Sequence, residues 1–297
     1  GKATGGKATR GKATGEKATG RSSGGKAPPE GPSDNQGESR IRDEPDPRLS
    51  RSLEYGVAIL ECFSGEQQAL GIAALADIVG ISRSTTHRYA ITLVALGYLE
   101  QDSKRRYLLS ARAASPGSAA IGAIRRQVPA RAALEELREE TGHTVSMAVL
   151  DRTRLIYVHR LLGHRRGQYE IDRDLGVGAT IPLHCTALGK VLLASLSDAE
   201  RRELLASLEL ARYGPNSIAD RKKLIAGLDR ISVREPVVSD EELVLGARSI
   251  AVLVPRPLGE HPLAIDVTAP SAAFTVEQLL RHAGPPLKRA ARLISGD

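Results

Sequence analysis

Hydrophobic residues first recur at helical spacing just after residue 49. Leu53, Val57 and Leu60 predict an amphipathic helix over residues 50–63. A second short helix is predicted from Ile72 and ends at Gly80, because glycine readily takes the left-handed conformation that closes a helix. The folded part of the chain is therefore expected to begin with two helices, the second of which ends in a tight glycine turn.

Ser82 is placed to cap a third helix, whose apolar side consists of Thr86, Ala90, Leu93 and Leu96. Polar and basic side chains gather in its first two turns and mostly face away from that side. They are Arg83, Ser84, Thr85, His87 and Arg88.

Two short strands are predicted over residues 98–101 and 106–109, around a polar turn that bears Lys104, Arg105 and Arg106. The major groove of DNA admits one helix, whose N-terminal residues reach base edges, and a basic hairpin beside it can meet phosphates. Residues 51–110 have six basic residues, of which five lie in the third helix and the hairpin. The pattern favours a DNA-reading unit; a small helical domain for protein contacts, with a solvated third helix, is the alternative.

Helices and strands are mixed after residue 128, which predicts an α+β architecture with helices packed on an antiparallel or mixed sheet. Predicted helices begin at Pro129, Ala187, Ser197 and near Asp220, and Thr275 caps the last one. Predicted strands cover residues 143–150, 154–161, 248–254 and 263–268.

Composition limits the class of protein. The 297 residues suggest about two globular units. No apolar run is long enough to cross a bilayer, so we expect no membrane partner. The two cysteines, Cys62 and Cys185, lie far apart without a metal-binding motif, which suits a cytoplasmic protein with no cofactor and no metal.

The N-terminal tail holds most of the net charge of +7. Residues 1–26 have seven Lys and Arg and one acidic residue, and residues 1–20 repeat a five-residue Gly-Lys-Ala-Thr pattern. This composition predicts disorder over residues 1–48, as a solvated tail or as a basic arm that binds phosphates without regard to sequence.

Three blocks of sequence resemble the IclR family of bacterial transcription regulators: SRSTTHRYAITLVALGYLEQDSKRRYLLS (82–110), IPLHCTALGKVLLASL (181–196) and SDEELVLGARSIAVLV (239–254). The resemblance implies a winged helix-turn-helix domain over residues 49–110, a connecting helix over 111–128 and a GAF-like effector-binding and oligomerisation domain over 129–297. It also implies a homodimer or homotetramer that binds double-stranded DNA at a palindromic operator. Pro116-Gly117 predicts a break or kink in the connecting helix.

The resemblance places effector contacts on the loop before the helix that starts at Ala187 and on two later strands. The residues are Leu183, His184, Cys185, Thr186, Ala187, Ala247, Ser249, Asp266 and Thr268. The helix N-terminus there is suited to a carboxylate; the alternative is that Thr186 is simply the N-cap and His184 a hydrogen-bonded structural side chain. Asp266 would repel an anion unless it is protonated or paired with Arg248, so it is either a pocket residue or a structural partner.

Catalysis is not expected. His184-Cys185 looks like a thiol–imidazole pair, but neighbouring residues usually point apart, and no motif for nucleophilic or metal catalysis occurs. The acidic run Asp240-Glu241-Glu242 is expected to be a solvated turn rather than a cation site.

The sequence thus predicts a repressor or activator of the IclR type that responds to a small aromatic or keto carboxylate. Residues 242–254, ELVLGARSIAVLV, look most like the branch that regulates protocatechuate and 4-hydroxybenzoate catabolism. The alternative is a sensor or interaction protein that binds DNA non-specifically through its basic tail.

Overall fold

The structure is a computed structural model that describes residues 1, 48–63, 68–127, 130–164, 175–255 and 262–296. The tail predicted to be disordered and the helix start predicted at Pro129 lie outside the described residues. No helix of the described chain is long and apolar enough to cross a membrane.

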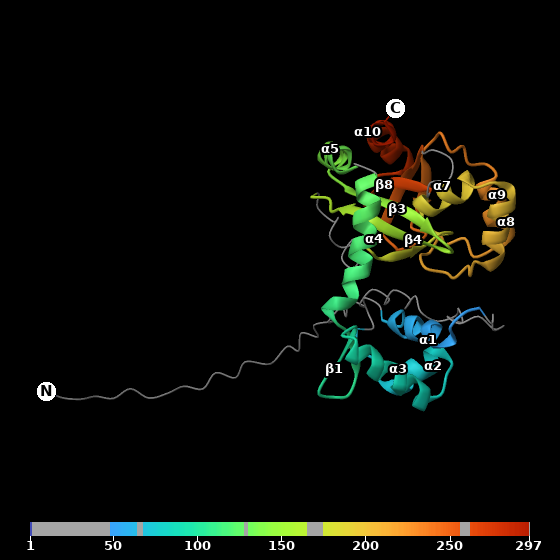
Figure 1. The fold of residues 1–297 in the computed structure, drawn as a ribbon. Coiled ribbons are helices and arrows are strands. Elements are labelled where there is room, and N and C mark those ends of the chain that lie inside the picture. The colour runs from blue at the N-terminus through green and yellow to red at the C-terminus, as the bar shows by residue number, and fades with distance from the viewer. Residues whose placement is uncertain (2–47, 64–67, 128–129, 165–174, 256–261, 297) are drawn as a thin grey trace, which may run out of the picture. The chain divides into compact units, whose positions relative to one another are not determined.

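Three helices and a hairpin form the helix–hairpin region (Figure 1). Its elements are α1 (Arg51–Leu60), α2 (Ile72–Val79), α3 (Arg83–Ala95), β1 (Leu99–Gln101) and β2 (Tyr107–Leu109). As predicted, Gly80 ends α2 with a φ of 76°. The hairpin is antiparallel, and an isolated bridge between Leu70 and Tyr107 ties it to the segment before α2.

The buried face of α1 differs from the one the spacing predicted. Leu53 and Val57 are 67% and 45% exposed, whereas Ala58 and Ile59 lie in the core of this region. With the partly buried Tyr55, Ala58 and Ile59 also recur at helical spacing, so periodicity alone could not choose between the two faces. The predicted apolar side of α3 is also wrong at its end, because Leu96 is 53% exposed.

The connecting helix α4 (Ala114–Gln127) is continuous, which corrects the predicted break at Pro116-Gly117. A short 3-10 turn, η1 (Ala111–Ala113), precedes it. Pro116 is the third residue of α4, where a backbone N–H has no partner within the helix, so proline costs little there. Near its other end, the Arg125 Nε donates to the Val158 carbonyl at 2.7 Å.

A six-stranded antiparallel sheet organises the rest of the described chain, which we call the sheet region. The strand order is β5-β4-β3-β8-β7-β6. The strands are β3 (Thr144–Asp151), β4 (Arg154–Leu161), β5 (Thr180–Pro182), β6 (Val237–Asp240), β7 (Ala247–Val254) and β8 (Leu263–Pro270). The helices are α5 (Arg131–Thr141), α7 (Ala187–Ser195), α8 (Asp198–Ser207), α9 (Arg221–Leu228) and α10 (Val276–Ser295).

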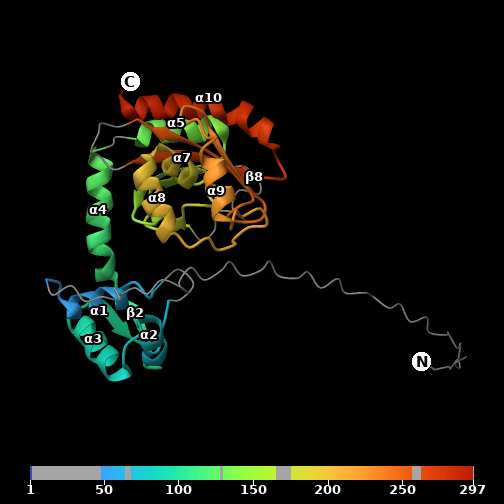
Figure 2. The same cartoon turned by 90° about the vertical axis from the view of Figure 1, so that its right-hand side faces the viewer.

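Helices cover both faces of this sheet (Figures 1 and 2). Alternate residues such as Val145 and Met147 pack with α5 and α10 in one core. Their neighbours, such as Ala148 and Ala264, pack with α7, α8 and α9 in a second core. The α+β architecture is therefore confirmed, and β3 is buried on both faces.

The helix starts follow the predicted caps. Thr186, Ser197, Asp220 and Thr275 each accept a hydrogen bond from a backbone N–H in the first turn. The edge strands β5 and β6 were not predicted, since each is short and has little alternation to mark it.

Gly189 gives the first test. A Cβ at this position would clash with the backbone of Leu183, whereas the exposed helical Gly227 has open space around it. We expect Gly189→Ala to lower the free energy of unfolding by about 3 kcal/mol, and Gly227→Ala to leave it unchanged or raise it by about 0.5–1 kcal/mol. Urea unfolding of both variants measures the difference; equal stabilities would contradict the tight contact.

His159 on β4 gives the second test. Burial, with the charges of Arg125 and Arg131, lowers its pKa to about 4 from an ordinary value of 6.5. Because the folded-state pKa is the lower one, the unfolded chain binds the proton first as the pH falls. The neutral His159 ring therefore makes its full contribution to the free energy of unfolding above about pH 6.5, and this contribution is lost as the pH falls toward 4.

Between pH 6.5 and pH 4, we expect the free energy of unfolding to fall by about 1–2 kcal/mol less in His159→Gln than in the wild type, allowing for partial solvent screening. The exposed His164→Gln is the matched control. An unchanged slope in His159→Gln would contradict the assignment.

Candidate nucleic-acid interface and ligand pocket

The start of α3 presents the predicted polar residues outward. The Ser82 Oγ accepts the Thr85 N–H at 3.2 Å, and the two hydroxyl oxygens lie 2.8 Å apart. Thr85 is half-buried, while the other predicted residues of this helix are exposed: Arg83, Ser84, His87 and Arg88. The cap thus fixes the first turn and leaves these four side chains accessible.

Arg88 is further oriented by its neighbour. Its guanidinium lies over the Tyr89 ring, 5.4 Å from the centroid, and the Tyr89 hydroxyl donates to the Ser52 Oγ of α1 at 3.2 Å. Stacking of this kind leaves the planar donor edge of an arginine open for bidentate bonds.

The hairpin tip is organised by Asp102, which the sequence pattern did not single out. Its Oδ1 accepts the backbone N–H groups of Lys104 and Arg106 at 2.9 and 2.8 Å. Hydrogen bonds from the Arg106 backbone, and then from its side chain, hold the pKa of Asp102 below its ordinary value. An aspartate at the start of a turn is the signal that could have found it.

All three predicted basic residues of the tip are exposed: Lys104, Arg105 and Arg106. Arg106 also forms an ion pair with Asp102 at 2.8 Å, and Arg105 takes a left-handed φ of 59°. The tip therefore presents three basic side chains to solvent, of which Arg106 is held in place by Asp102.

Six of the nine predicted effector residues line one small hollow of about 50 Å³ on the α7 side of the sheet. They come from the α7 entry and from β7 and β8: Cys185, Thr186, Ala247, Ser249, Asp266 and Thr268. Sequence reasoning missed the remaining lining residues: Tyr157, Arg160, Leu175, Ser239, Leu243 and Val244.

Strand register explains why these residues meet. Ser239 pairs with Ser249, and Ser249 with Thr268, so three hydroxyls form a row across β6, β7 and β8. Further along β8, Asp266 pairs with Ser146, and Ser146 pairs with Arg160. Polar residues within otherwise apolar buried strands are the signal that could have pointed to the missed members.

Of the two roles considered for Asp266, the one that involved Arg248 is not seen, because Arg248 is engaged with a different carboxylate. The Asp266 Oδ1 accepts the Ser146 N–H at 3.1 Å, while Arg248 forms an ion pair with Asp240 at 2.6 Å. The Arg160 Nη1 donates to the Ser146 Oγ at 2.9 Å. Ser146 therefore stands between a carboxylate and a guanidinium that both line the hollow.

Three predicted effector residues do not line it. Leu183 and Ala187 are fully buried in the core behind α7. The His184 Nε2 lies 2.8 Å from the Ala211 carbonyl oxygen, and burial lowers the His184 pKa. The ring is engaged with the Ala211 backbone, in keeping with the structural alternative for this residue.

Thr186 both caps α7 and lines the hollow. Its Oγ1 accepts the Gly189 N–H at 3.0 Å and donates to the Pro182 carbonyl at 3.0 Å. The start of α7, with its partial positive charge, thus lies beside the lining residues and favours an anionic ligand group.

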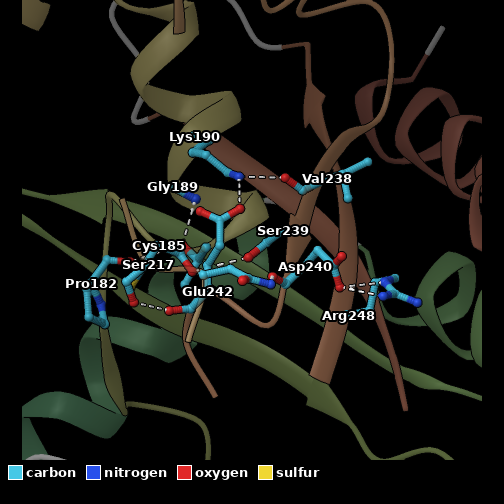
Figure 3. A network of polar contacts seen from close by, with 12 residues as sticks. Pro182, Cys185, Gly189, Lys190, Ser217, Val238, Ser239, Asp240, Glu242 and Arg248 are labelled. Carbon is cyan, nitrogen blue, oxygen red and sulfur yellow. Dashed lines mark hydrogen bonds and ion pairs between the residues drawn. The ribbon is translucent and has the colours of Figure 1, made fainter. Parts of the chain in front are cut away.

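The acidic run is not a solvated turn, contrary to the prediction. Asp240 is paired with Arg248, and Glu242 is buried against Lys190 (Figure 3). Within the described ranges, no three His, Cys, Asp or Glu side chains are grouped to hold a metal ion.

A larger hollow of about 400 Å³ lies elsewhere, between α9 and β6. Its walls are mainly apolar, with Leu224, Leu228 and Val237 among them, and it contains none of the predicted effector residues. Size alone therefore favours this hollow as the ligand site, whereas the convergence of polar groups favours the smaller hollow.

Comparison with known proteins agrees with this arrangement. Residues 52–103 match the IclR helix-turn-helix domain, and residues 124–296 match the bacterial transcriptional regulator IclR C-terminal domain. The Pca regulon regulatory protein of Pseudomonas putida is 29% identical over 83% of this chain and 84% of its own length. The p-hydroxybenzoate hydroxylase transcriptional activator of Acinetobacter baylyi is 29% identical over 80% of this chain and 88% of its own length.

The fold is also that of a solved structure. The crystal structure of an IclR homolog complexed with 4-hydroxybenzoate, from Microbacterium hydrocarbonoxydans, superposes with a TM-score of 0.65 and 23% identity, over 82% of this chain and 98% of that one. The two matched domains together account for most of the chain, from α1 to the end of α10. The protein belongs to the IclR family of bacterial transcription regulators.

Proposed function

We propose that this regulator binds a palindromic operator as a homodimer or homotetramer. A small aromatic carboxylate changes its affinity for that operator. The observation that carries the proposal is the convergence at one hollow of polar residues from α7, β7 and β8, with Arg160 and Asp266 on either side of Ser146 in register. The protein acts in the cytoplasm and is not an enzyme.

Ser84, His87 and Arg88 read base edges, with Thr85 at the edge of the contact because its hydroxyl is engaged with Ser82. Phosphates are bound by Arg83 and by the hairpin tip: Lys104, Arg105 and Arg106. One such module reads only a few base pairs, so a two-fold pair of modules on a two-fold operator supplies the specificity.

The ligand carboxylate lies between Arg160 and the start of α7, where a guanidinium and a helix dipole both favour negative charge. Tyr157, Leu175 and Leu243 supply apolar surface for a ring. Asp266 is suited to accept a hydrogen bond from a phenolic hydroxyl, so it selects a hydroxylated ring rather than repelling the acid. This choice agrees with the aromatic compounds named for the similar proteins above.

The hollow must widen to admit such a molecule. Ligand pockets usually have about 300–1,000 Å³, far more than the 50 Å³ found here. Val244 and Leu245, in the loop between β6 and β7, are 41% and 65% exposed. In this proposal, the loop between β6 and β7 is the part of the lining that moves outward to widen the hollow.

The DNA assignment predicts different effects for one arginine and one lysine variant. On an operator selected from random DNA, Arg88→Ala should weaken binding by about 1–3 kcal/mol and relax the preference for one base at a single position, because a base contact is lost. Lys104→Ala should weaken all sequences alike and reduce the salt slope by about one, because a phosphate contact is lost. Fluorescence anisotropy over a series of salt concentrations measures both effects.

Arg202 is an exposed basic residue on α8, so Arg202→Ala is the control. It should change neither the base preference nor the salt dependence of DNA binding. Equal loss on every sequence from Arg88→Ala would contradict base reading. A protein that binds DNA only through its basic tail would instead lose nearly all affinity, for every sequence, when residues 1–48 are removed.

The effector assignment predicts selectivity for acids. 4-Hydroxybenzoate should raise the melting temperature, while the uncharged 4-hydroxybenzamide should not. Arg160→Gln should weaken 4-hydroxybenzoate binding at least tenfold, or about 1.4 kcal/mol, whereas the exposed Arg152→Gln should not. Stabilisation by uncharged ligands alone would contradict the proposal.

A further inference from the structure

A buried ion pair lies behind the hollow. The Lys190 Nζ is 2.5 Å from the Glu242 Oε1 and donates to the Val238 carbonyl at 2.6 Å (Figure 3). Lys190 and Glu242 are only 8% and 7% exposed. Taking two charges out of water is costly even when they are paired, so such a pair is weak support for stability alone.

The pair joins two walls of the hollow. Lys190 lies one turn into α7, after the lining residues Cys185 and Thr186. Glu242 directly precedes the lining residues Leu243 and Val244. Neither member of the pair lines this hollow, although Lys190 lines the larger one, so an effect on a ligand in the small hollow must pass through these neighbours.

The loop is fixed at its base and exposed at its tip. The Glu242 carbonyl accepts the Gly214 N–H at 2.8 Å and the Ser217 hydroxyl at 2.5 Å. Glu241 has a left-handed φ of 53°, which is costly for a residue with a side chain. Its Oε1 accepts the Gly246 N–H at 3.2 Å, which closes the loop on itself.

Close approach of a second loop keeps this base in place. A Cβ at Gly214 would clash with the backbone of Glu241 and Glu242, so only glycine fits there. One oxygen of the pair, the Glu242 Oε2, is buried and has no hydrogen-bond partner among the described residues. Lys190 is therefore the cation on which the buried carboxylate depends.

We propose that Lys190 and Glu242 are positioning residues that set the loop of residues 241–247 against the start of α7 and thereby set the affinity for the effector. The inference rests on the proposed function, because it takes the hollow as the effector site. With the base held, only the tip moves to admit the ligand. Without the pair, the whole wall is loosened, and its ordering must accompany binding, which weakens the complex.

The test uses the full chain with Lys190→Met and Glu242→Gln, singly and together. Lys288→Met is the matched control, since Lys288 forms an ion pair of the same 2.5 Å length with Glu235, but with side chains 35% and 65% exposed. Three quantities are measured: amide hydrogen exchange of residues 243–247 without ligand, the Kd for 4-hydroxybenzoate, and the Kd for the operator without ligand.

We expect exchange to quicken at least tenfold and 4-hydroxybenzoate to bind at least tenfold more weakly in each single variant, with operator affinity within twofold of wild type. The double variant should recover melting temperature, because no lone buried charge remains, but not the slow exchange or the ligand affinity. Glu242→Gln keeps a hydrogen-bonding oxygen for Lys190, so it serves if Lys190→Met fails to fold.

The outcomes separate the inference from the proposed function. If wild type does not bind 4-hydroxybenzoate but exchange still quickens in the variants, the effector assignment and the claim about ligand affinity both fail, and only the ordering of the loop by the pair is supported. If the melting temperature falls while exchange and ligand affinity match those of Lys288→Met, the pair is purely structural and the inference is overturned.

Discussion

Burial of β3 and β8 on both faces of the sheet is the constraint on which the rest of this structure depends. Strands buried on both sides require helices on both sides, and α5 with α10 and α7 with its neighbours meet that need. Polar groups on such strands must then find partners within the protein. Ser146, Asp266 and Arg160 do so across three adjacent strands, and this arrangement places opposite charges beside the hollow.

A buried ion pair between Lys190 and Glu242 links α7 to the loop that follows β6. The Lys190 Nζ on α7 donates to the Val238 carbonyl of β6 and to the Glu242 carboxylate in the loop after β6. Together with the contact between Ser239 and the Cys185 carbonyl at 3.2 Å, it connects the start of α7 to the far edge of the sheet. The hollow is thus bounded by elements that are tied to each other by polar contacts rather than by apolar packing alone.

Local signals in the sequence predicted local structure well. Ser82, Ser197 and Thr275 cap the helices they were expected to cap, and Gly80 ends its helix in the left-handed conformation. These features depend on a few neighbouring residues. The break predicted at Pro116 was wrong because the position of proline within a helix decides its effect, and local pattern did not reveal where that helix begins.

Tertiary contacts could not be read in the same way. Leu53 and Ile59 lie on stripes of equal periodicity, and only packing against the rest of the region decides which is buried. The partner of Arg248 depends on strand order, which brings Asp240 beside it and leaves Asp266 opposite Ala251. Arg160 lines the hollow because strand register places it beside Ser146, so no local motif could have assigned it.

We propose that ligand binding on the sheet and operator binding on α3 are thermodynamically coupled. The most direct test is the Kd of the full chain for its selected operator, with and without saturating 4-hydroxybenzoate at one fixed salt concentration, beside scrambled DNA of the same length. We predict a change of at least about fivefold, in either direction, on the operator, and no change on scrambled DNA. Identical operator affinities with and without bound acid would contradict the account.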